Sequence, residues 1–145
     1  MNAKRVVAGA FAGGLVWSVW SFLINFVLMR AEYTAEGQAG MLLAQPRYGV
    51  TAFVITWFAT LFLLAGACSW LYAVARRSRG PGPQTALKVG VVVGFAAGFP
   101  ITLLVTSWAP LTRTVPLAWL IDMWVGAILA TVVAGWFYQD KASGA

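Results

Sequence analysis

The stretch that decides the fold reads VVAGAFAGGLVWSVWSFLINFVLM, from Val6 to Met29, and contains no charged side chain. About 20 apolar residues are enough for an α-helix to cross a bilayer, so this stretch crosses once and is too short to cross twice. Lys4 and Arg5 precede it, as basic residues precede the apolar core of a signal peptide. Because this stretch is about twice as long as such a core, we expect a retained transmembrane helix.

Three further stretches of the same kind follow, and the only acidic residue in any of them is Asp122. None shows the ten-residue alternation of apolar and polar residues that is typical of β-barrel strands. The sequence therefore predicts an all-α integral membrane protein, with a single transmembrane domain over residues 1–145 that forms a four-helix bundle. The expected helices cover residues 6–29, 50–75, 87–109 and 116–138.

Composition supports this class and excludes several functions. Hydrophobic residues make up 61% of the chain and charged residues 10%, against about 45–50% and about 25% in soluble domains. There is no His and one Cys, so imidazole ligands, an intrachain disulfide and a CxxC redox pair are excluded. We expect no metal site and no cofactor. An enzyme is the least favoured class, because no nucleophile–base pair or phosphate loop is visible.

The basic residues predict the orientation in the membrane. Seven of the ten fall on one side of the four-helix arrangement, and three, Arg30, Arg47 and Arg113, fall on the other. The positive-inside rule then places both termini and the second loop in the cytoplasm. The net charge of +6 reflects this bias and attraction to anionic lipid, and it requires no nucleic-acid partner. The seven are Lys4, Arg5, Arg76, Arg77, Arg79, Lys88 and Lys141.

The longest connection covers residues 30–49. Its segment 35–44 contains Met41, Leu42 and Leu43 and stops before Pro46. The segment is interpreted either as a short helix lying on the outer membrane surface or as an ordered loop.

The segment WLYAVARRSRGPGPQTA, from Trp70 to Ala86, fits the pattern W-L-Y-A-x-x-R-x-x-x-G-P-G-P-x-T-A. It resembles a pattern found in small bacterial four-helix membrane proteins that have no established function. The resemblance covers 17 of the 145 residues. It implies a multi-pass protein of the bacterial inner membrane and implies no activity.

Rows of small residues recur at four-residue spacing, which places them on one helix face and lets helix backbones approach closely. We expect these faces to pack within the bundle or to form the interface of a homo-oligomer or a larger membrane complex. Pro100, in the middle of the third helix, predicts either a hinge or a static kink. The small residues are Gly9, Gly13, Gly90, Gly94, Gly98, Gly126, Ala130 and Ala134.

The candidate functional site is centred on Asp122. A carboxylate inside a membrane helix costs about 2.5–3.5 kcal/mol on insertion scales, so a compensating partner is required. Four polar residues lie at a similar expected depth in the other helices: Asn25, Thr56, Thr106 and Ser107. The structural alternative is that Asp122 pairs with Arg30, Arg47 or Arg113, or is neutral and hydrogen-bonded to a threonine.

Two functions follow from these features. The first is a non-catalytic inner-membrane protein that acts as a packing or interaction subunit, which the small-residue faces favour. The second is a small cation-coupled transporter or channel in which Asp122 binds the cation.

The four-helix arrangement makes a testable prediction about topology. Reporter fusions at Gly40 and Gly82 should give opposite readouts, with Gly40 outside and Gly82 in the cytoplasm, because the basic residues divide between the two sides. A phosphatase and a fluorescent reporter at each position would measure this. The same readout at both positions would contradict four crossings.

Overall fold

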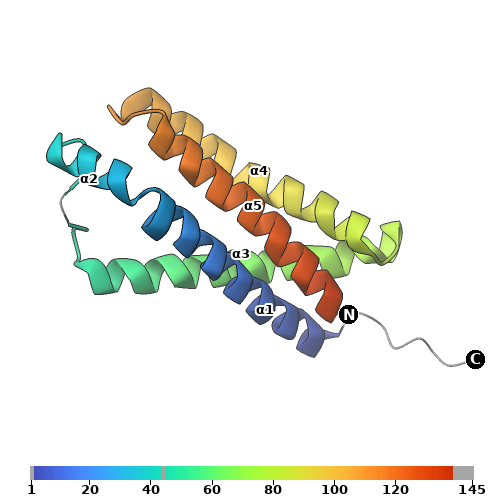
Figure 1. The fold of residues 1–145 in the computed structure, drawn as a ribbon. Coiled ribbons are helices and arrows are strands. Elements are labelled where there is room, and N and C mark those ends of the chain that lie inside the picture. The colour runs from blue at the N-terminus through green and yellow to red at the C-terminus, as the bar shows by residue number, and fades with distance from the viewer. Residues whose placement is uncertain (1, 44, 139–145) are drawn as a thin grey trace, which may run out of the picture.

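The computed structural model describes residues 2–43 and 45–138, and over these residues it is helical throughout, with no strand (Figure 1). The first helix, α1, runs straight into a π-helical segment, η1, and a short helix, α2, follows before three long helices. Their bounds are α1 Ala3–Phe22, η1 Leu23–Leu28, α2 Arg30–Gln38, α3 Val50–Arg79, α4 Pro83–Trp108 and α5 Thr114–Phe137.

Four of these helical stretches are long and apolar enough to cross a membrane: Ala3–Leu28, Val50–Arg79, Pro83–Trp108 and Thr114–Phe137. The prediction of an all-helical chain with four such segments is therefore confirmed for the described residues. The second connection between the spans is shorter than expected, because α3 continues to Arg79 and α4 begins at Pro83. Arginine is a good helix former, and its long side chain carries the charge beyond the apolar layer. Gly80, at φ 81°, then ends α3.

The first connection contains a helix, but it lies earlier than expected. Helix α2 covers Arg30–Gln38 rather than residues 35–44, and Ala44 is outside the described residues. Gly40, at φ 74°, ends the helix. The N–H of Met41 donates to the Glu36 carbonyl at 2.9 Å, and that of Gly40 donates to the Gly37 carbonyl at 3.1 Å. This is the Schellman arrangement that a left-handed glycine permits, so the apolar residues after Gly40 do not extend the helix.

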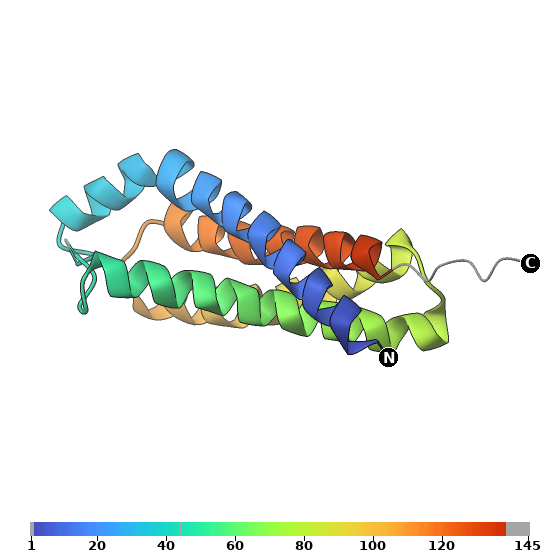
Figure 2. The same ribbon diagram turned by 90° about the horizontal axis from the view of Figure 1, so that it is seen from below.

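Helix α5 is the central element of the bundle. It packs along both α1 and α4, which have no contact with each other in the described chain, and it also contacts α3. Figure 1 shows α4 and α5 lying side by side, and Figure 2 shows α1 and α3 crossing and then separating toward α2. The buried core between α1, α3 and α5 includes Trp17, Leu61 and Ala127.

Glycines permit this close packing. A methyl group added at Gly13 would lie 2.8 Å from the Ala130 carbonyl oxygen, and one at Gly94 would lie 2.8 Å from the Trp124 Cα atom. Such distances leave no room for a side chain, so these rows face α5 within the chain. The other positions behave alike: Gly9 faces Ala134, Gly90 faces Ile128, Gly98 faces Leu120 and Met123, and Gly126 is covered by the Trp17 indole.

One end of the bundle, which we call the Tyr138 end, gathers the start of α1 and the ends of α3 and α5. The backbone N–H of Asn2 donates to the Tyr138 hydroxyl at 2.8 Å. The buried Arg76 guanidinium donates to the Tyr138 carbonyl and lies 4.7 Å from the centre of its ring. A cation at this position satisfies a carbonyl that the end of α5 leaves free. The opposite end, which carries α2, is called the α2 end.

Residues of the Trp70–Ala86 pattern build the turn at the Tyr138 end. The Thr85 hydroxyl donates to the Gly80 carbonyl at 2.9 Å, and the Gly82 N–H donates to the Tyr72 hydroxyl at 3.3 Å. Gly80 and Gly82 both adopt positive φ, at 81° and 138°, which side chains other than glycine rarely adopt. The pattern therefore has a structural use in this chain, as a fixed turn between α3 and α4.

The packing of α4 on α5 makes a quantitative prediction. Gly94→Leu should lower stability by several kcal/mol, given about 1–3 kcal/mol for each overpacked group in a core, because even a Cβ atom at this position meets the Trp124 backbone. The matched control is Gly66→Leu, since no atom lies within 4 Å of a methyl group at Gly66. Thermal unfolding in detergent would measure both variants. Equal melting temperatures for the two would contradict the packing described here.

Candidate functional site

Asp122 is fully buried in the first half of α5, with 0% of its surface exposed, and it is the only acidic residue in the four spans. Its Oδ2 atom accepts two hydrogen bonds from the α1–η1 stretch. The Ser21 hydroxyl donates at 2.8 Å and the Asn25 side-chain amide donates at 2.6 Å. Bonds to an ionised oxygen are stronger than bonds between neutral groups, so this contact joins α5 to α1 firmly.

Asn25 owes its position to the π-helical segment η1. The N–H of Met29 donates to the Ile24 carbonyl at 2.9 Å, which is the five-residue spacing of a π-helix. The Asn25 side-chain amide also donates to the Ser21 carbonyl at 3.0 Å, and a side chain that bonds into the backbone ladder is one cause of local helix distortion. Segments of this kind occur frequently at functional sites.

An outer ring of aromatic residues holds these polar groups in place. From α3, the Trp57 indole N–H donates to the Ser21 hydroxyl oxygen at 2.9 Å. From α2, the Tyr33 hydroxyl donates to the Asn25 carbonyl oxygen at 2.6 Å, and the Trp119 indole N–H of α5 donates to the Tyr33 oxygen at 2.8 Å. Every helical element except α4 therefore contributes a residue to the site. We call these six residues, Asp122, Ser21, Asn25, Tyr33, Trp57 and Trp119, the Asp122 network.

Two buried atoms beside the network have no hydrogen-bond partner among the described residues. They are Asp122 Oδ1 and the indole nitrogen of Trp17. Trp17 is also fully buried, and its N–H is close enough to the carboxyl group to interact electrostatically without hydrogen-bond geometry. Buried polar atoms are nearly always paired, so an unpaired carboxyl oxygen marks a group with unused binding capacity.

The arginine alternative is wrong for the described residues. Over residues 2–43 and 45–138, Asp122 forms hydrogen bonds with Ser21 and Asn25 and no ion pair with Arg30, Arg47 or Arg113. No threonine bonds to it either. The carboxyl group is compensated by neutral donors instead.

Only Asn25 of the four expected neighbours meets Asp122. The hydroxyls of Thr56, Thr106 and Ser107 each donate to a carbonyl of their own helix, four residues earlier. This is the usual local bond of a hydroxyl in a membrane helix, and it leaves these side chains outside the Asp122 network. Pro100 lies inside α4 with its side chain exposed, away from the network, so its role as a hinge or a static kink stays a prediction.

The sequence reasoning missed five residues of the site, and one signal could have found Ser21. Ser21 lies four residues before Asn25, on the same helix face, so a group that meets one is within reach of the other. Trp17 precedes Ser21 by another four residues. Tyr33, Trp57 and Trp119 gave no comparable signal, because aromatic residues at interfaces and in cores have no fixed sequence spacing.

Helix α2 is fixed to the bundle by two side chains three residues apart. Tyr33 reaches Asn25, and the buried Glu36 carboxylate accepts from the Thr112 N–H, before α5, at 2.9 Å. Hydrogen bonds from Thr112, through its side chain and its backbone, hold the pKa of Glu36 below its usual range. Burial raises the pKa of the Tyr33 hydroxyl, and the nearby Asp122 carboxyl raises it further, so this phenol stays neutral.

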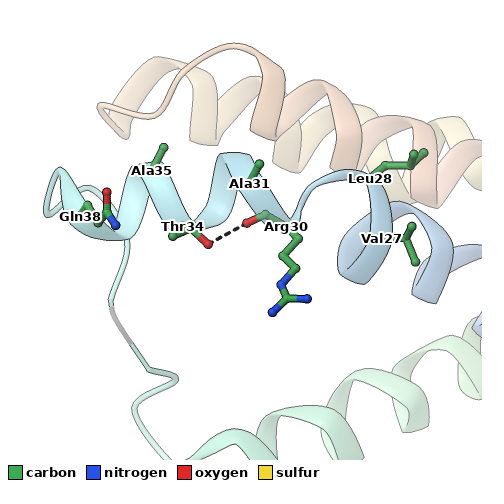
Figure 3. Close-up of a pocket in the computed structure, with 7 residues that line it drawn as sticks. All are labelled: Val27, Leu28, Arg30, Ala31, Thr34, Ala35 and Gln38. Carbon is green, nitrogen blue, oxygen red and sulfur yellow. Dashed lines mark hydrogen bonds between the residues drawn. The ribbon is translucent and has the colours of Figure 1, made fainter.

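A surface hollow of the described chain lies elsewhere. It measures about 570 Å³ and is formed by the exposed face of η1 and α2, including Val27, Arg30 and Gln38 (Figure 3). A smaller hollow of about 220 Å³ lies at the start of α3, around Tyr48 and Phe53. Neither is lined by a residue of the Asp122 network.

No group of three or more His, Cys, Asp or Glu side chains that could hold a metal ion is present in the described part of the chain. The oxygens around Asp122 are also occupied. Asn25 Oδ1 accepts from Tyr33, and the Ser21 oxygen accepts from Trp57. A hard metal ion requires several free oxygens, and the groups that face the carboxyl here are hydrogen-bond donors.

The geometry predicts different effects for two hydroxyl deletions. Ser21→Ala removes a donor to Asp122 and the acceptor of Trp57, so it should destabilise the fold by about 1–3 kcal/mol. Thr56→Val is the control: its hydroxyl bonds only within α3, and it should change stability by less than about 0.5 kcal/mol. Unfolding of both variants in the same detergent would test this, and a larger loss for Thr56→Val would contradict the site.

Neither a protein-family model, nor a curated protein, nor a solved structure matches this chain. The resemblance carried by the Trp70–Ala86 pattern therefore stays an interpretation.

Proposed function

We propose that this is a non-catalytic, multi-pass protein of the bacterial inner membrane, with both termini in the cytoplasm, in which the buried Asp122 carboxyl binds and releases a proton. The observation that carries the proposal is the Oδ1 atom of Asp122, fully buried and without a hydrogen-bond partner in the described chain. Acidic residues inside membrane bundles commonly belong to proton relays or ion pathways. The orientation rests on the distribution of Lys and Arg.

A proton fits this centre better than a metal cation does. A proton needs one free oxygen, and Asp122 Oδ1 is one. A sodium or potassium ion would need further oxygens, whereas the neighbouring Ser21 and Asn25 direct an O–H and an N–H group at the carboxyl. The sequence also suggested a cation-coupled transporter. If the protein is one, we propose that its coupling cation is a proton.

Protonation of Asp122 would change the hydrogen bonds that its carboxyl group can make with the donors around it. A carboxylate accepts hydrogen bonds only, whereas a protonated carboxyl has one O–H that must itself find an acceptor. The arrangement of Ser21 and Asn25 suits the ionised form. A bundle whose polar centre suits one protonation state must adjust when the other forms, which is the physical requirement of a proton-linked transporter or sensor.

A packing or interaction subunit has less support. The glycine rows that suggested it, such as Gly9 with Gly13 and Gly94 with Gly98, face α5 within the chain. A partner would therefore have to bind a different surface.

The test is an infrared pH titration of the whole protein in lipid, comparing wild type with Asp122→Asn. The wild type should show the carbonyl band of one buried protonated carboxyl that grows as pH falls, and the variant should lack it. Asn retains the acceptor oxygen but loses the charge, so the variant should fold with a loss of about 1–2 kcal/mol at neutral pH. Thr56→Val serves as the control and should titrate as the wild type does.

Two outcomes would contradict the proposal. One is an identical carboxyl titration in wild type and Asp122→Asn. The other is a rise in melting temperature with sodium or potassium at constant pH and ionic strength, lost in Asp122→Asn, which would identify a metal cation as the ligand.

A further inference from the structure

Asp122 lies much closer to the α2 end of the bundle than to the Tyr138 end. Helix α5 begins at Thr114 and ends at Phe137, so the carboxyl group lies about 12 Å along the helix from one end and about 22 Å from the other. The side chains that separate the carboxyl group from water also differ in kind on the two sides.

Toward the Tyr138 end the carboxyl group is covered by fully buried apolar side chains. The Trp17 indole occupies the space beside Gly126, one turn of α5 beyond Asp122. Further side chains with 0% exposure follow it from α3 and α5. We call this set the apolar barrier, and its members are Trp17, Leu61, Ala65, Cys68, Ala127 and Ala130.

The apolar barrier provides no path for a proton. A proton path requires groups that both accept and donate, and an indole N–H only donates. The nearest hydroxyls on this side are bonded to backbone. Thr131 donates to the Ala127 carbonyl at 2.6 Å, and Ser69 donates to the Val6 carbonyl at 2.8 Å. Over residues 2–43 and 45–138, neither hydroxyl is hydrogen-bonded to Asp122.

Toward the α2 end the carboxyl group is covered by polar, half-buried side chains. Asn25 bonds to it directly, and Tyr33 and Trp57 form the next layer. Helix α3 packs along α1, but none of its Cα atoms lies within 8 Å of one in η1 or α2 in the described chain. Figure 2 shows this separation. Both surface hollows lie at this end, one on η1 and α2 and the other at the start of α3.

Resting on the proposed function, we propose that Asp122 exchanges its proton with water at the α2 end alone. The protein is then a sensor of pH in the compartment that the α2 end faces, and it does not carry protons across the membrane. In the orientation predicted from the basic residues, that compartment lies outside the cytoplasm.

Proton exchange requires a brief local opening, because Asp122 is fully buried. Such openings cost least where few apolar side chains are packed, which is the side of Asn25, Tyr33 and Trp57 rather than the apolar barrier. The two carboxyl oxygens exchange places by a half turn about the Cβ–Cγ bond. After closure, a proton on one oxygen leaves the other free to accept from Ser21 and Asn25, so the bundle retains either protonation state.

Tyr33 is the titratable residue of the described chain that interacts with Asp122 from a neighbouring element. Its phenol stays neutral, and the lowered pKa of Glu36 keeps that carboxylate ionised above pH about 5. Helices α1, α3 and α4 have no titratable residue within ten positions of the side chains that pack beside Asp122. Their nearest ones are Arg5, Cys68 and Lys88.

An infrared measurement on full-length protein in sealed vesicles tests the proposal. Vesicles with unequal shares of the two orientations are prepared, and the share with the α2 end outside is measured by labelling Leu43→Cys with an impermeant maleimide. Leu43 is 70% exposed, whereas the native Cys68 is buried. The external pH is then lowered while a trapped dye confirms that the internal pH is unchanged, and a proton ionophore is added last.

The share of the Asp122 carbonyl band that appears before the ionophore should equal the labelled share, and the remainder should appear after it. Asp122→Asn provides the baseline. Appearance of the whole band before the ionophore would show access from both ends, and a share equal to the unlabelled molecules would show access from the Tyr138 end. Either result overturns the inference and leaves the proton site standing. If no band appears even with the ionophore, the proposed function fails as well.

Trp17→Ala tests the apolar barrier itself. Removing the indole leaves space beside a carboxyl group, which water can fill, so the whole band should appear before the ionophore. Trp70→Ala is the matched control, since Trp70 is 50% exposed and lies outside the barrier, and it should behave as the wild type does. A folded Trp17→Ala variant with the wild-type response would contradict the role given to Trp17. The wild-type measurement decides the sidedness whether or not this variant folds.

Discussion

A single buried carboxyl oxygen, Asp122 Oδ2, accounts for much of the arrangement of this bundle. A carboxylate removed from water is strongly unfavourable unless donors replace the lost hydration, and here the donors come from two successive turns of the α1–η1 stretch, at Ser21 and Asn25. Helices α1 and α5 must approach closely for these bonds to form. The absence of side chains at Gly9 and Gly13 permits that approach along the rest of the contact.

The remaining members of the network follow from the need to orient those two donors. A hydroxyl or an amide that bonds to a carboxylate has further bonding capacity, and burial requires that this capacity be used. Trp57 uses the second site of Ser21, and Tyr33 uses the carbonyl oxygen of Asn25. Helix α2, outside the four spans, is therefore linked by two hydrogen bonds to Asp122, the most buried acidic residue in the described chain.

Much of the fold could be predicted from the sequence, because uncharged stretches of bilayer length have few alternatives. The site was predicted in part, for a geometric reason. Position along a helix gives the depth of a side chain, and depth correctly paired Asn25 with Asp122. Depth does not give the direction in which a side chain points around the helix axis. Thr56, Thr106 and Ser107 were therefore expected beside Asp122, but their hydroxyls bond within their own helices. Tyr33 could not be predicted for a different reason. Its place depends on α2, which begins at Arg30, whereas the sequence suggested a helix only over residues 35–44.

The central position of α5 has a consequence for biosynthesis. This helix is the last of the four to be synthesised, yet it supplies the surface on which α1 and α4 pack. Before it inserts, α1 and α3 can associate with each other, but the glycine faces that await α5 are covered only by lipid chains. Asp122 then enters a membrane in which Ser21 and Asn25 are already present. Asp122 makes α5 costly to insert, but its hydrogen bonds to Ser21 and Asn25 also fix α5 against the helices that are already in the membrane.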